Sequence, residues 1–309
     1  MVKIFLILIL LVTLDAKTLN RMQVIMSTFV TISVDDRYSR YIEEAFKVVK
    51  DVESSISSYK PKSTVSLLNK NKHVYLDSYT YEALVLSEKY YIKSNGYFDI
   101  TVGSITKDLY RFGKNEHLAS TQELSSAKVD FGALCFDNKE ASLDIGVKID
   151  LGGMGKGFAV DKVIEYFKSN EVEGATVSAS GDIRCMDKCN IEIQDPFSEG
   201  VLLSFKTTKK NLGISTSGTY NRYVKNQQNN HLINPKLKKP QTKFISITLV
   251  GETSNADLDA YATASSVMPV AEAYRFLDSV GVAYIVLESN GVLKSGGKLF
   301  LIVSDAIKK

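Results

Sequence analysis

A stretch of twelve residues near the middle of the chain constrains the fold most. It reads Asp-Leu-Gly-Gly-Met-Gly-Lys-Gly-Phe-Ala-Val-Asp, from Asp150 to Asp161. Alternating apolar residues from Leu143 to Ile149 predict a preceding strand, and the apolar spacing from Val160 to Phe167 predicts a following helix. Glycines between a strand and a helix permit positive φ angles and close approach of a ligand, and the N–H groups that open a helix attract anions. The stretch therefore suggests a phosphate-binding turn.

The spacing matches neither of two familiar nucleotide motifs. It is not the dinucleotide fingerprint G-x-G-x-x-G, and it is not the phosphate loop G-x-x-x-x-G-K-[ST], because Gly157 follows Lys156. An ordinary strand-to-helix turn needs some of these glycines as well. Phosphate binding and a plain turn both stay open on this segment alone.

Length and charge limit the classes of protein. The chain has 309 residues and 44% hydrophobic content, which is enough for a sizeable core. Its 38 basic and 35 acidic residues leave a net charge of +3 and are spread along the sequence. We therefore expect no nucleic-acid partner and no strongly anionic membrane surface as a partner.

The N-terminus resembles an export signal. One lysine precedes the apolar run Ile4–Val12, which is too short to span a bilayer comfortably. We interpret residues 1–16 as a signal peptide ending at Ala16. Leu14 is a poor residue for a cleavage site, so an uncleaved inner-membrane anchor is the alternative. Residues 17–309 are then one intertwined domain outside the cytoplasm, most simply in a bacterial periplasm.

Three cysteines are an odd number for an exported protein. Cys185 and Cys189 could form a local disulfide if the loop between them turns back. Two thiols alone supply too few ligands for a metal site. Cys135 is interpreted as a buried small hydrophobe.

Periodicity along the chain predicts an α+β fold with mixed or antiparallel sheets and packed helices. Alternation from Val24 to Val34 predicts a strand, and helical spacing follows from Tyr41 to Ile56. The segment Tyr97–Gly103 is expected to be extended. Further strands are expected at Leu212–Ser217, Phe244–Val250, Tyr284–Leu287 and Leu299–Val303, and further helices are expected at 78–94, from Asn255, and through 271–277.

Three short motifs place polar groups at expected strand ends. Gly96–Thr101 could frame a flat ring or be an ordinary strand. Thr216–Arg222 offers hydroxyls and a guanidinium to phosphate oxygens, although Ser-Gly turns are common. His231, in a polar neighbourhood, could orient or protonate a phosphate. A Ser-His-Asp hydrolase would need Ser217 with His231, but there is no G-x-S-x-G elbow and no orienting acid is evident.

Two oxygen-bearing residues lie four apart in the expected helix after Asn255. Asp259 and Thr263 would share one helix face, about 5–6 Å apart at Cβ. A carboxylate and a hydroxyl so placed are hard ligands suited to Mg²⁺. The competing account is an acid in the first helical turn, which Asp257 fits better than Asp259.

Taken in order, these segments resemble the FAD:protein FMN transferase family, the ApbE-like flavin transferases. The resemblance covers nearly the whole mature chain. It is carried by the segments Met26–Thr28, Ser58–Asn69, Gly96–Val102, Asp150–Gly157, Ser180–Ile183, Ser215–Tyr220, His231–Pro235 and Asp259–Thr263.

The resemblance implies an ApbE-like architecture related to the T-fold and an enzyme that uses Mg²⁺ to split FAD. Such an enzyme moves FMN onto a Thr or Ser hydroxyl of an exported or membrane-bound redox protein and releases AMP, which is protein flavinylation. The implied metal ligands are the Gly153 carbonyl, Asp259 and Thr263. Asp259 and His231 are the implied catalytic residues. The implied flavin and adenosine contacts are Met26, Tyr59, Tyr97, Phe98, Asp99, Asp150, Lys156 and His231.

Some segments depart from the family pattern. Pro235–Lys239 replaces a usual Pro-x-Thr-Gly, and Ser180 stands where glycine is usual. Two other functions stay open, because water attacks the same phosphorus as a protein hydroxyl. One is an FAD pyrophosphatase that yields FMN and AMP, and the other is an FAD carrier without chemistry.

Overall fold

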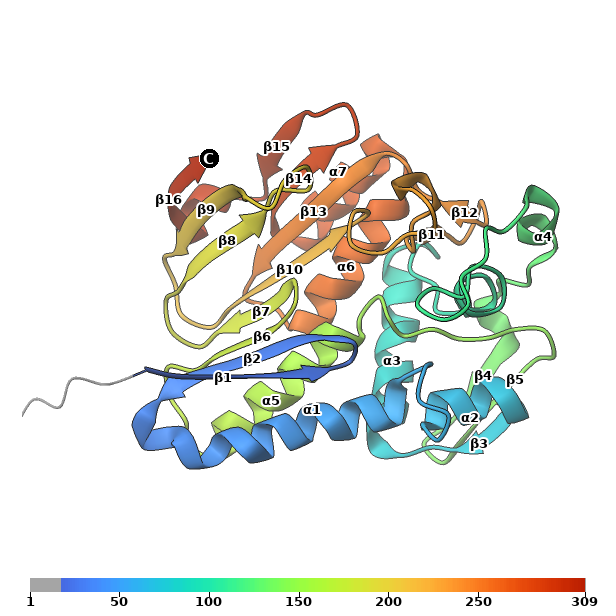
Figure 1. Cartoon of the computed structure of the whole chain (residues 1–309), viewed down its shortest axis with the longest axis horizontal. Helices are drawn as coiled ribbons and strands as arrows, with labels where there is room; N and C mark the ends of the chain where they lie inside the picture. The colour runs from blue at the N-terminus through green and yellow to red at the C-terminus, as the bar shows by residue number, and fades with distance from the viewer. Residues whose placement is uncertain (1–17, 309) are drawn as a thin grey trace, which may run out of the picture.

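The computed structural model describes residues 18–308 and is built on an eight-stranded sheet (Figure 1). The strand order is β1-β2-β6-β7-β10-β13-β14-β15, and all neighbours are antiparallel. The predicted α+β class with antiparallel sheets is confirmed. The strands are β1 Thr18–Ile25, β2 Thr28–Asp35, β6 Thr176–Ala179, β7 Asp182–Cys185, β10 Leu212–Gly218, β13 Phe244–Gly251, β14 Ala283–Glu288 and β15 Leu293–Gly296.

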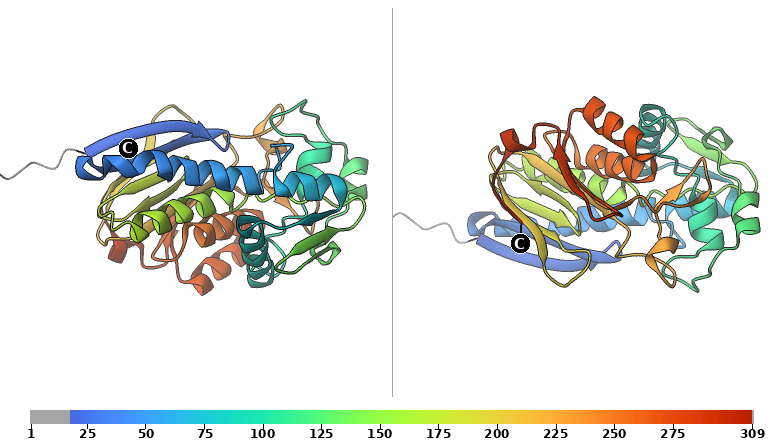
Figure 2. Two further views of the ribbon diagram at one scale, coloured as in Figure 1. Left: turned by 90° about the horizontal axis from the view of Figure 1, so that it is seen from below. Right: turned by 90° about the horizontal axis from the view of Figure 1, so that it is seen from above.

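Helices cover one face of this sheet (Figure 2). They are α1 Ile42–Ile56, α5 Gly155–Ser169, α6 Asn255–Val267 and α7 Val270–Val280. Alternate residues of β2, such as Val30 and Ile32, meet helix residues such as Val163 and Phe167, and all four side chains are fully buried. Burial of each such side chain contributes roughly 1.5–3 kcal/mol. This layer holds α5 and α6 against each other and against the sheet.

A second, three-stranded sheet covers the opposite face. It consists of β8 Asn190–Gln194, β9 Val201–Thr207 and β16 Val303–Lys308, in the order β16-β9-β8. The side chains of β14 alternate between the two cores: Ala283 and Ile285 pack toward the small sheet, and Tyr284 and Val286 pack toward the helices. Strand β14 is therefore buried on both faces.

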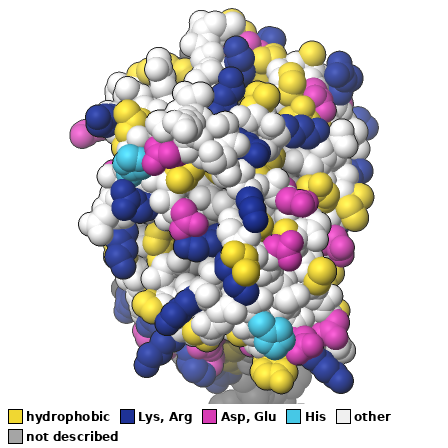
Figure 3. Space-filling view, turned by 90° about the vertical axis from the view of Figure 1, so that its right-hand side faces the viewer, with side chains coloured by type: hydrophobic (Ala, Val, Ile, Leu, Met, Phe, Trp, Pro, Cys, Tyr) yellow, Lys and Arg dark blue, Asp and Glu magenta, His cyan; other side chains and the backbone are white. Residues whose placement is uncertain are grey.

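A smaller unit closes one end of the molecule, and charges of both signs are interspersed over its surface (Figure 3). Its sheet has the order β3-β5-β4. Its elements are α2 Thr64–Asn71, β3 His73–Tyr75, α3 Ser78–Lys93, the π-helix η2 Ser104–Leu109, α4 Thr121–Ser126, β4 Leu134–Phe136, β5 Glu140–Leu143, β11 Ile233–Asn234 and β12 Lys239–Pro240. The remaining short helices are η1 Asp36–Tyr41, η3 Phe131–Ala133, η4 Gln227–Asn229 and α8 Leu299–Ile302.

Four predicted strands are wrong in detail. The span 24–34 is a hairpin that turns at Met26-Ser27, and 97–103 is a series of turns, not a strand. The strand expected over 143–149 ends at Leu143 as β5, leaving one parallel bridge between Val102 and Lys148. The strand expected over 299–303 is mostly α8, and β16 then joins the small sheet. Short apolar runs do not distinguish a strand from a buried turn or helix.

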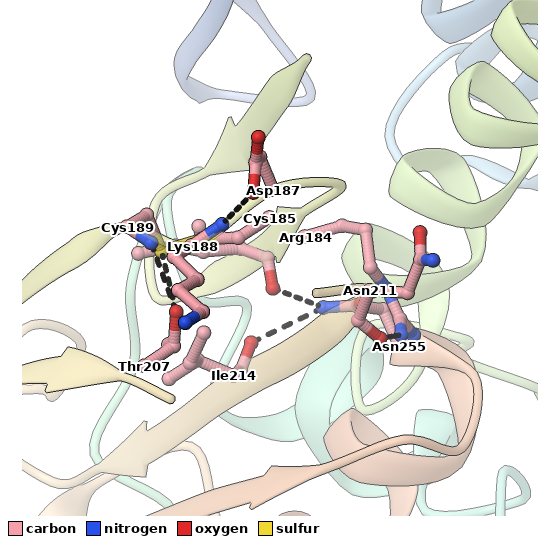
Figure 4. Close-up of a disulfide and its surroundings, with 10 residues drawn as sticks. Arg184, Cys185, Asp187, Lys188, Cys189, Thr207, Asn211, Ile214 and Asn255 are labelled. Carbon is pink, nitrogen blue, oxygen red and sulfur yellow. Dashed lines mark hydrogen bonds between the residues drawn. A yellow bond between two sulfur atoms is a disulfide. The ribbon is translucent and has the colours of Figure 1, made fainter. Parts of the chain in front are cut away.

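Cys185 and Cys189 form a disulfide beside Arg184 (Figure 4), so the local disulfide is confirmed. The Arg184 guanidinium donates to Asn255 Oδ1 at 2.7 Å and thereby ties β7 to α6. The prediction for Cys135 is wrong, because its side chain is exposed on the small sheet β3-β5-β4.

Reducing this disulfide should lower the free energy of unfolding by about 2 kcal/mol, the chain-entropy value for so short a loop. The measurement is urea unfolding of the Cys135→Ala variant with and without dithiothreitol. In this variant the two cysteines of the disulfide are the only cysteines left. Adding Cys185→Ala and Cys189→Ala gives a control that should not respond to the reductant. An equal response in both proteins would contradict the prediction.

Candidate functional site

Three charged side chains from different elements form what we call the acidic cluster: Lys156 of α5, Asp182 of β7 and Asp259 of α6. Lys156 Nζ lies 2.7 Å from Asp182 Oδ2 and 3.4 Å from Asp259 Oδ2. Both carboxylates are buried, and Asp182 also accepts a 2.6 Å hydrogen bond from Ser215. When both carboxylates are ionised, they and the ammonium leave a surplus of one negative charge. A buried cluster of this charge favours a further cation.

The glycine-rich stretch brings α5 and α6 into direct contact. The Gly157 N–H donates to Asp259 Oδ2 at 3.2 Å. A Cβ at Gly157 would overlap the backbone carbonyl of Asn255. The Asp161 carboxylate accepts the N–H groups of Asn255 and Ala256, each at 2.8 Å, and so caps α6. An N–H group at the start of α5 is therefore used to fix the Asp259 carboxylate.

Burial and the charge of Asp182 raise the pKa of Asp259, and Lys156 lowers it; the net result is a pKa of about 7. Burial disfavours the Lys156 ammonium, but the two carboxylates outweigh this and raise its pKa above the ordinary value. Lys156 is therefore charged at neutral pH. A cation near Asp259 would favour the ionised carboxylate.

The oxygen groups around Asp259 fit a hard metal ion such as Mg²⁺. Thr263 lies one turn further along α6, and a Cβ on Gly153 would lie 3.3 Å from Thr263 Oγ1. The Ser217 hydroxyl lies 3.4 Å from Thr263 Oγ1. Within residues 18–308 no group of three or more His, Cys, Asp or Glu side chains could hold a metal. One carboxylate with hydroxyl and carbonyl oxygens is a set typical of Mg²⁺ rather than zinc.

Asp150, at the start of the stretch, is fully engaged by donors. Its Oδ2 accepts from Thr106 at 2.8 Å and lies 3.1 Å from Lys107 Nζ. Its Oδ1 accepts from Ser58 at 3.2 Å and from the Gly152 N–H at 3.1 Å. Burial disfavours the carboxylate, but Lys107 and these donors lower its pKa below the ordinary value. Asp150 thus joins three segments of the chain through three hydrogen bonds and one ion pair.

An aromatic ring connects this ion pair to His231. Lys107 Nζ lies 3.4 Å from the ring centroid of Tyr59, and the Arg222 guanidinium lies 5.2 Å from it. The Arg222 carbonyl in turn accepts from His231 Nδ1 at 3.1 Å. The predicted residues Tyr59, Asp150 and His231 are therefore brought together through Lys107 and Arg222.

Burial, together with the positive charges of Arg222 and Lys156, lowers the pKa of His231 to about 4. The imidazole is therefore neutral at neutral pH. Because a carbonyl accepts from Nδ1, the proton is assigned to Nδ1, and Nε2 carries the lone pair. Such a group accepts a proton more readily than it donates one. The geometry does not pair His231 with Ser217, whose hydroxyl lies near Thr263.

Two predicted flavin contacts lie against the glycine-rich stretch. Met26 has φ 55° in the β1–β2 turn, and its N–H donates to Glu53 at 3.0 Å. Its Cε atom lies 3.7 Å from where a Cβ on Gly155 would be. Phe98 is buried, and its ring lies 3.3 Å from where a Cβ on Gly153 would be. Both side chains therefore border the same backbone as the acidic cluster.

Two other predicted contacts are engaged elsewhere. The Tyr97 hydroxyl donates to Glu272 at 2.9 Å, and Lys236 Nζ lies 3.9 Å from the Tyr97 ring centroid. Asp99 accepts from the N–H and hydroxyl of Thr101 at 2.8 and 2.6 Å, and burial raises its pKa. Both residues are held by these partners, next to Phe98 in the chain.

Sequence reasoning missed the roles of Asp182 and Lys107. Asp182 stands in the quoted segment 180–183, but nothing in a short strand marks its carboxylate as fully buried. Lys107 follows a segment that was expected to be a strand, and the π-helix η2 gives no periodic signal. Ser180 has φ 58°, which explains why glycine suits that position.

Comparison with known proteins assigns the family. The ApbE family model matches residues 26–286, so the chain belongs to the ApbE family. It is 29% identical over 224 residues to the FAD:protein FMN transferase of Buchnera aphidicola subsp. Schizaphis graminum, covering 65% of each chain. It is 27% identical to that of Haemophilus influenzae, covering 84% of this chain and 82% of the relative. The match to the Klebsiella pneumoniae relative spans only 55% of that protein.

Solved structures agree on the fold. The ApbE protein of Thermotoga maritima superposes with a TM-score of 0.82 at 23% identity, covering 92% of this chain and 99% of that one. The flavin transferase ApbE of Vibrio cholerae gives 0.78 at 20% identity, covering 91% and 97%. The expected resemblance and the ApbE-like architecture are confirmed, and the relatives' names place those relatives among the transferases.

Proposed function

We propose that this chain transfers FMN from FAD to a Thr or Ser hydroxyl of another protein, with Mg²⁺, and releases AMP. The acidic cluster is the observation that carries the proposal. Its surplus negative charge and oxygen ligands suit a divalent cation, and a neutral histidine base lies close by. The relatives' name, FAD:protein FMN transferase, supports the same reaction.

In this mechanism Asp259, Thr263 and the Gly153 carbonyl would hold Mg²⁺, which supplies positive charge to the diphosphate of FAD. Lys156 fixes the Asp259 carboxylate and adds a second positive charge. His231 Nε2 accepts the proton of the attacking hydroxyl. That oxygen forms a bond to the phosphorus of the FMN half, the bond from this phosphorus to the bridging oxygen breaks, and AMP leaves with that oxygen.

A direct assay tests this proposal. The protein is incubated with FAD, Mg²⁺ and a candidate acceptor domain, and the acceptor is examined for covalent flavin fluorescence. Labelled acceptor with one AMP per flavin supports transfer. AMP with free FMN would indicate the pyrophosphatase instead, and bound, unchanged FAD would indicate a carrier. Labelling that persists in EDTA would overturn the magnesium requirement.

The pH profile should report the unprotonated His231. Since the neutral imidazole is the active form and saturating Mg²⁺ keeps Asp259 ionised, kcat/KM at saturating Mg²⁺ is lost as pH falls through the His231 pKa of about 4, not through about 6.5. The measurement is AMP release between pH 3.5 and 8, with circular dichroism at each pH to verify folding. His231→Gln should be slow at every pH and lack this step. A wild-type midpoint near 6.5 would contradict the assignment.

We also propose a periplasmic location with an exported or membrane-bound redox protein as acceptor, because residues 1–16 resemble a signal peptide. That segment lies outside the described residues. Among residues 18–308 no helix has the length and apolar character to cross a bilayer. Fractionation of cells expressing the full chain, with and without residues 2–16, tests the location. Equal retention of both forms in the cytoplasm would overturn it.

A further inference from the structure

Two cationic side chains meet at the ring of Tyr59, and we call Lys107 and Arg222 the basic pair. Lys107 comes from η2, and Arg222 follows β10, so the chain brings them together from distant segments. Each lies over the same ring, at 3.4 and 5.2 Å from its centroid. Tyr59 itself is 43% exposed. The pair therefore lies directly beneath a surface side chain.

The Lys107 ammonium has more N–H donors than its hydrogen bonds use. Its side chain is 10% exposed, and it forms an ion pair with Asp150 at 3.1 Å. Within the described part of the chain, Nζ makes no hydrogen bond of good geometry. An ammonium carries three N–H donors, and leaving them unmet in a buried place is costly. Rotation of the Tyr59 ring would open this group to an anion.

The Arg222 guanidinium likewise has more N–H donors than its hydrogen bonds use. A guanidinium has five N–H donors, and in residues 18–308 this one has a single long hydrogen bond, 3.4 Å to the Phe112 carbonyl. The Arg222 backbone carbonyl accepts from His231 Nδ1. The free guanidinium donors therefore belong to the residue that also orients the proposed base.

The charges around Tyr59 are opposite to those of the acidic cluster. Lys107 and Arg222 carry two positive charges, and Asp150 carries one negative charge and already accepts three hydrogen bonds. The region keeps a surplus of one positive charge. The acidic cluster suits a metal cation, whereas this region suits a phosphate.

We propose that the basic pair binds the phosphate that leaves with AMP. The inference rests on the proposed function and assigns two residues to its leaving group. When the diphosphate is cleaved, negative charge develops on the departing phosphate, and preorganised cationic donors stabilise that charge. Arginine can bind two phosphate oxygens at once, and lysine adds a point charge. Tyr59 covers Lys107 until the phosphate enters.

The test compares AMP with adenosine, which differ by the phosphate alone. Calorimetry gives both dissociation constants for the wild type, Lys107→Met and Arg222→Met. The wild type should prefer AMP, and each substitution should reduce the ratio of adenosine to AMP dissociation constants by about tenfold, a typical loss for one charge-assisted contact. Arg222→Lys and Lys107→Arg, which keep the charge, should retain most of the ratio. Lys206→Met removes an exposed lysine of β9 and should leave the ratio unchanged.

If the ratio of adenosine to AMP dissociation constants is unchanged in both Lys107→Met and Arg222→Met, the inference is overturned. An equal reduction of this ratio in Lys206→Met would overturn it as well. Acceptor labelling by the wild type tests the proposed function separately. Normal labelling with an unchanged ratio would overturn only the role of the basic pair. Absence of labelling and of AMP release in the wild type would overturn the proposed function itself.

Discussion

Replacing Asp259 with alanine should lower the rate of FMN transfer by about 10²- to 10³-fold, a loss typical of removing one electrostatic group from a transition state. FAD should still bind. Without Asp259 the acidic cluster retains Lys156 and Asp182, which neutralise each other at 2.7 Å, so its attraction for a cation disappears. Because Lys156 and Asp182 still pair with each other, no buried charge is left unpaired, and the fold should persist. Single-turnover labelling and FAD fluorescence titration measure the two effects.

Asp257→Ala provides the matched control for this experiment. Asp257 lies two residues earlier in α6, but its carboxylate pairs with Lys89 at 2.8 Å. Its removal should affect stability more than chemistry. Full activity in Asp259→Ala, or an equal loss in Asp257→Ala, would contradict the role given to Asp259.

Gly157→Ala should cost about 1–3 kcal/mol of stability, the usual range for overpacking, together with most of the activity. The added methyl would overlap the Asn255 carbonyl, which is backbone and cannot rotate away. Helix α6 would have to shift, and Asp259 would lose its hydrogen bond from the residue-157 N–H. Urea unfolding and the Mg²⁺ dependence of AMP release measure the two consequences.

Gly155→Ala is the comparison within the same helix. A methyl there would meet the ends of the flexible Ile56 and Met26 side chains, at 3.2 and 3.7 Å. These atoms can adjust, so the loss of stability should be smaller than at Gly157. Equal losses at both positions would indicate a general intolerance of side chains in this turn instead of a specific helix contact.

Helical periodicity was the part of the site that the sequence could specify. The spacing of Asp259 and Thr263 places them on one face of any helix, and α6 forms as expected. The helix after the glycine-rich stretch also forms, but α5 already begins at Gly155, before the apolar spacing from Val160 to Phe167. Repeating patterns depend on neighbours in the chain, so a single sequence reveals them.

The β1–β2 hairpin shows why some turns are invisible in a sequence. Alternation from Val24 to Val34 continues through Met26-Ser27 because a two-residue turn preserves the period of two. Both turn residues adopt positive φ, 55° and 58°, where Asn or Gly would normally signal the turn. The buried pairings of Lys107 and Asp182 were equally hidden, since each depends on partners brought from elsewhere by the fold.

The contacts of Lys156 with Asp182 and Asp259 bridge 26 and 103 residues of sequence. Pairings at such separation require long loops to close, so they form late in folding. Catalytic competence should therefore appear only with the last steps of chain assembly. Recovery of AMP release after dilution from denaturant should therefore report the completion of folding. Far-ultraviolet ellipticity should return earlier, because the local helices form first.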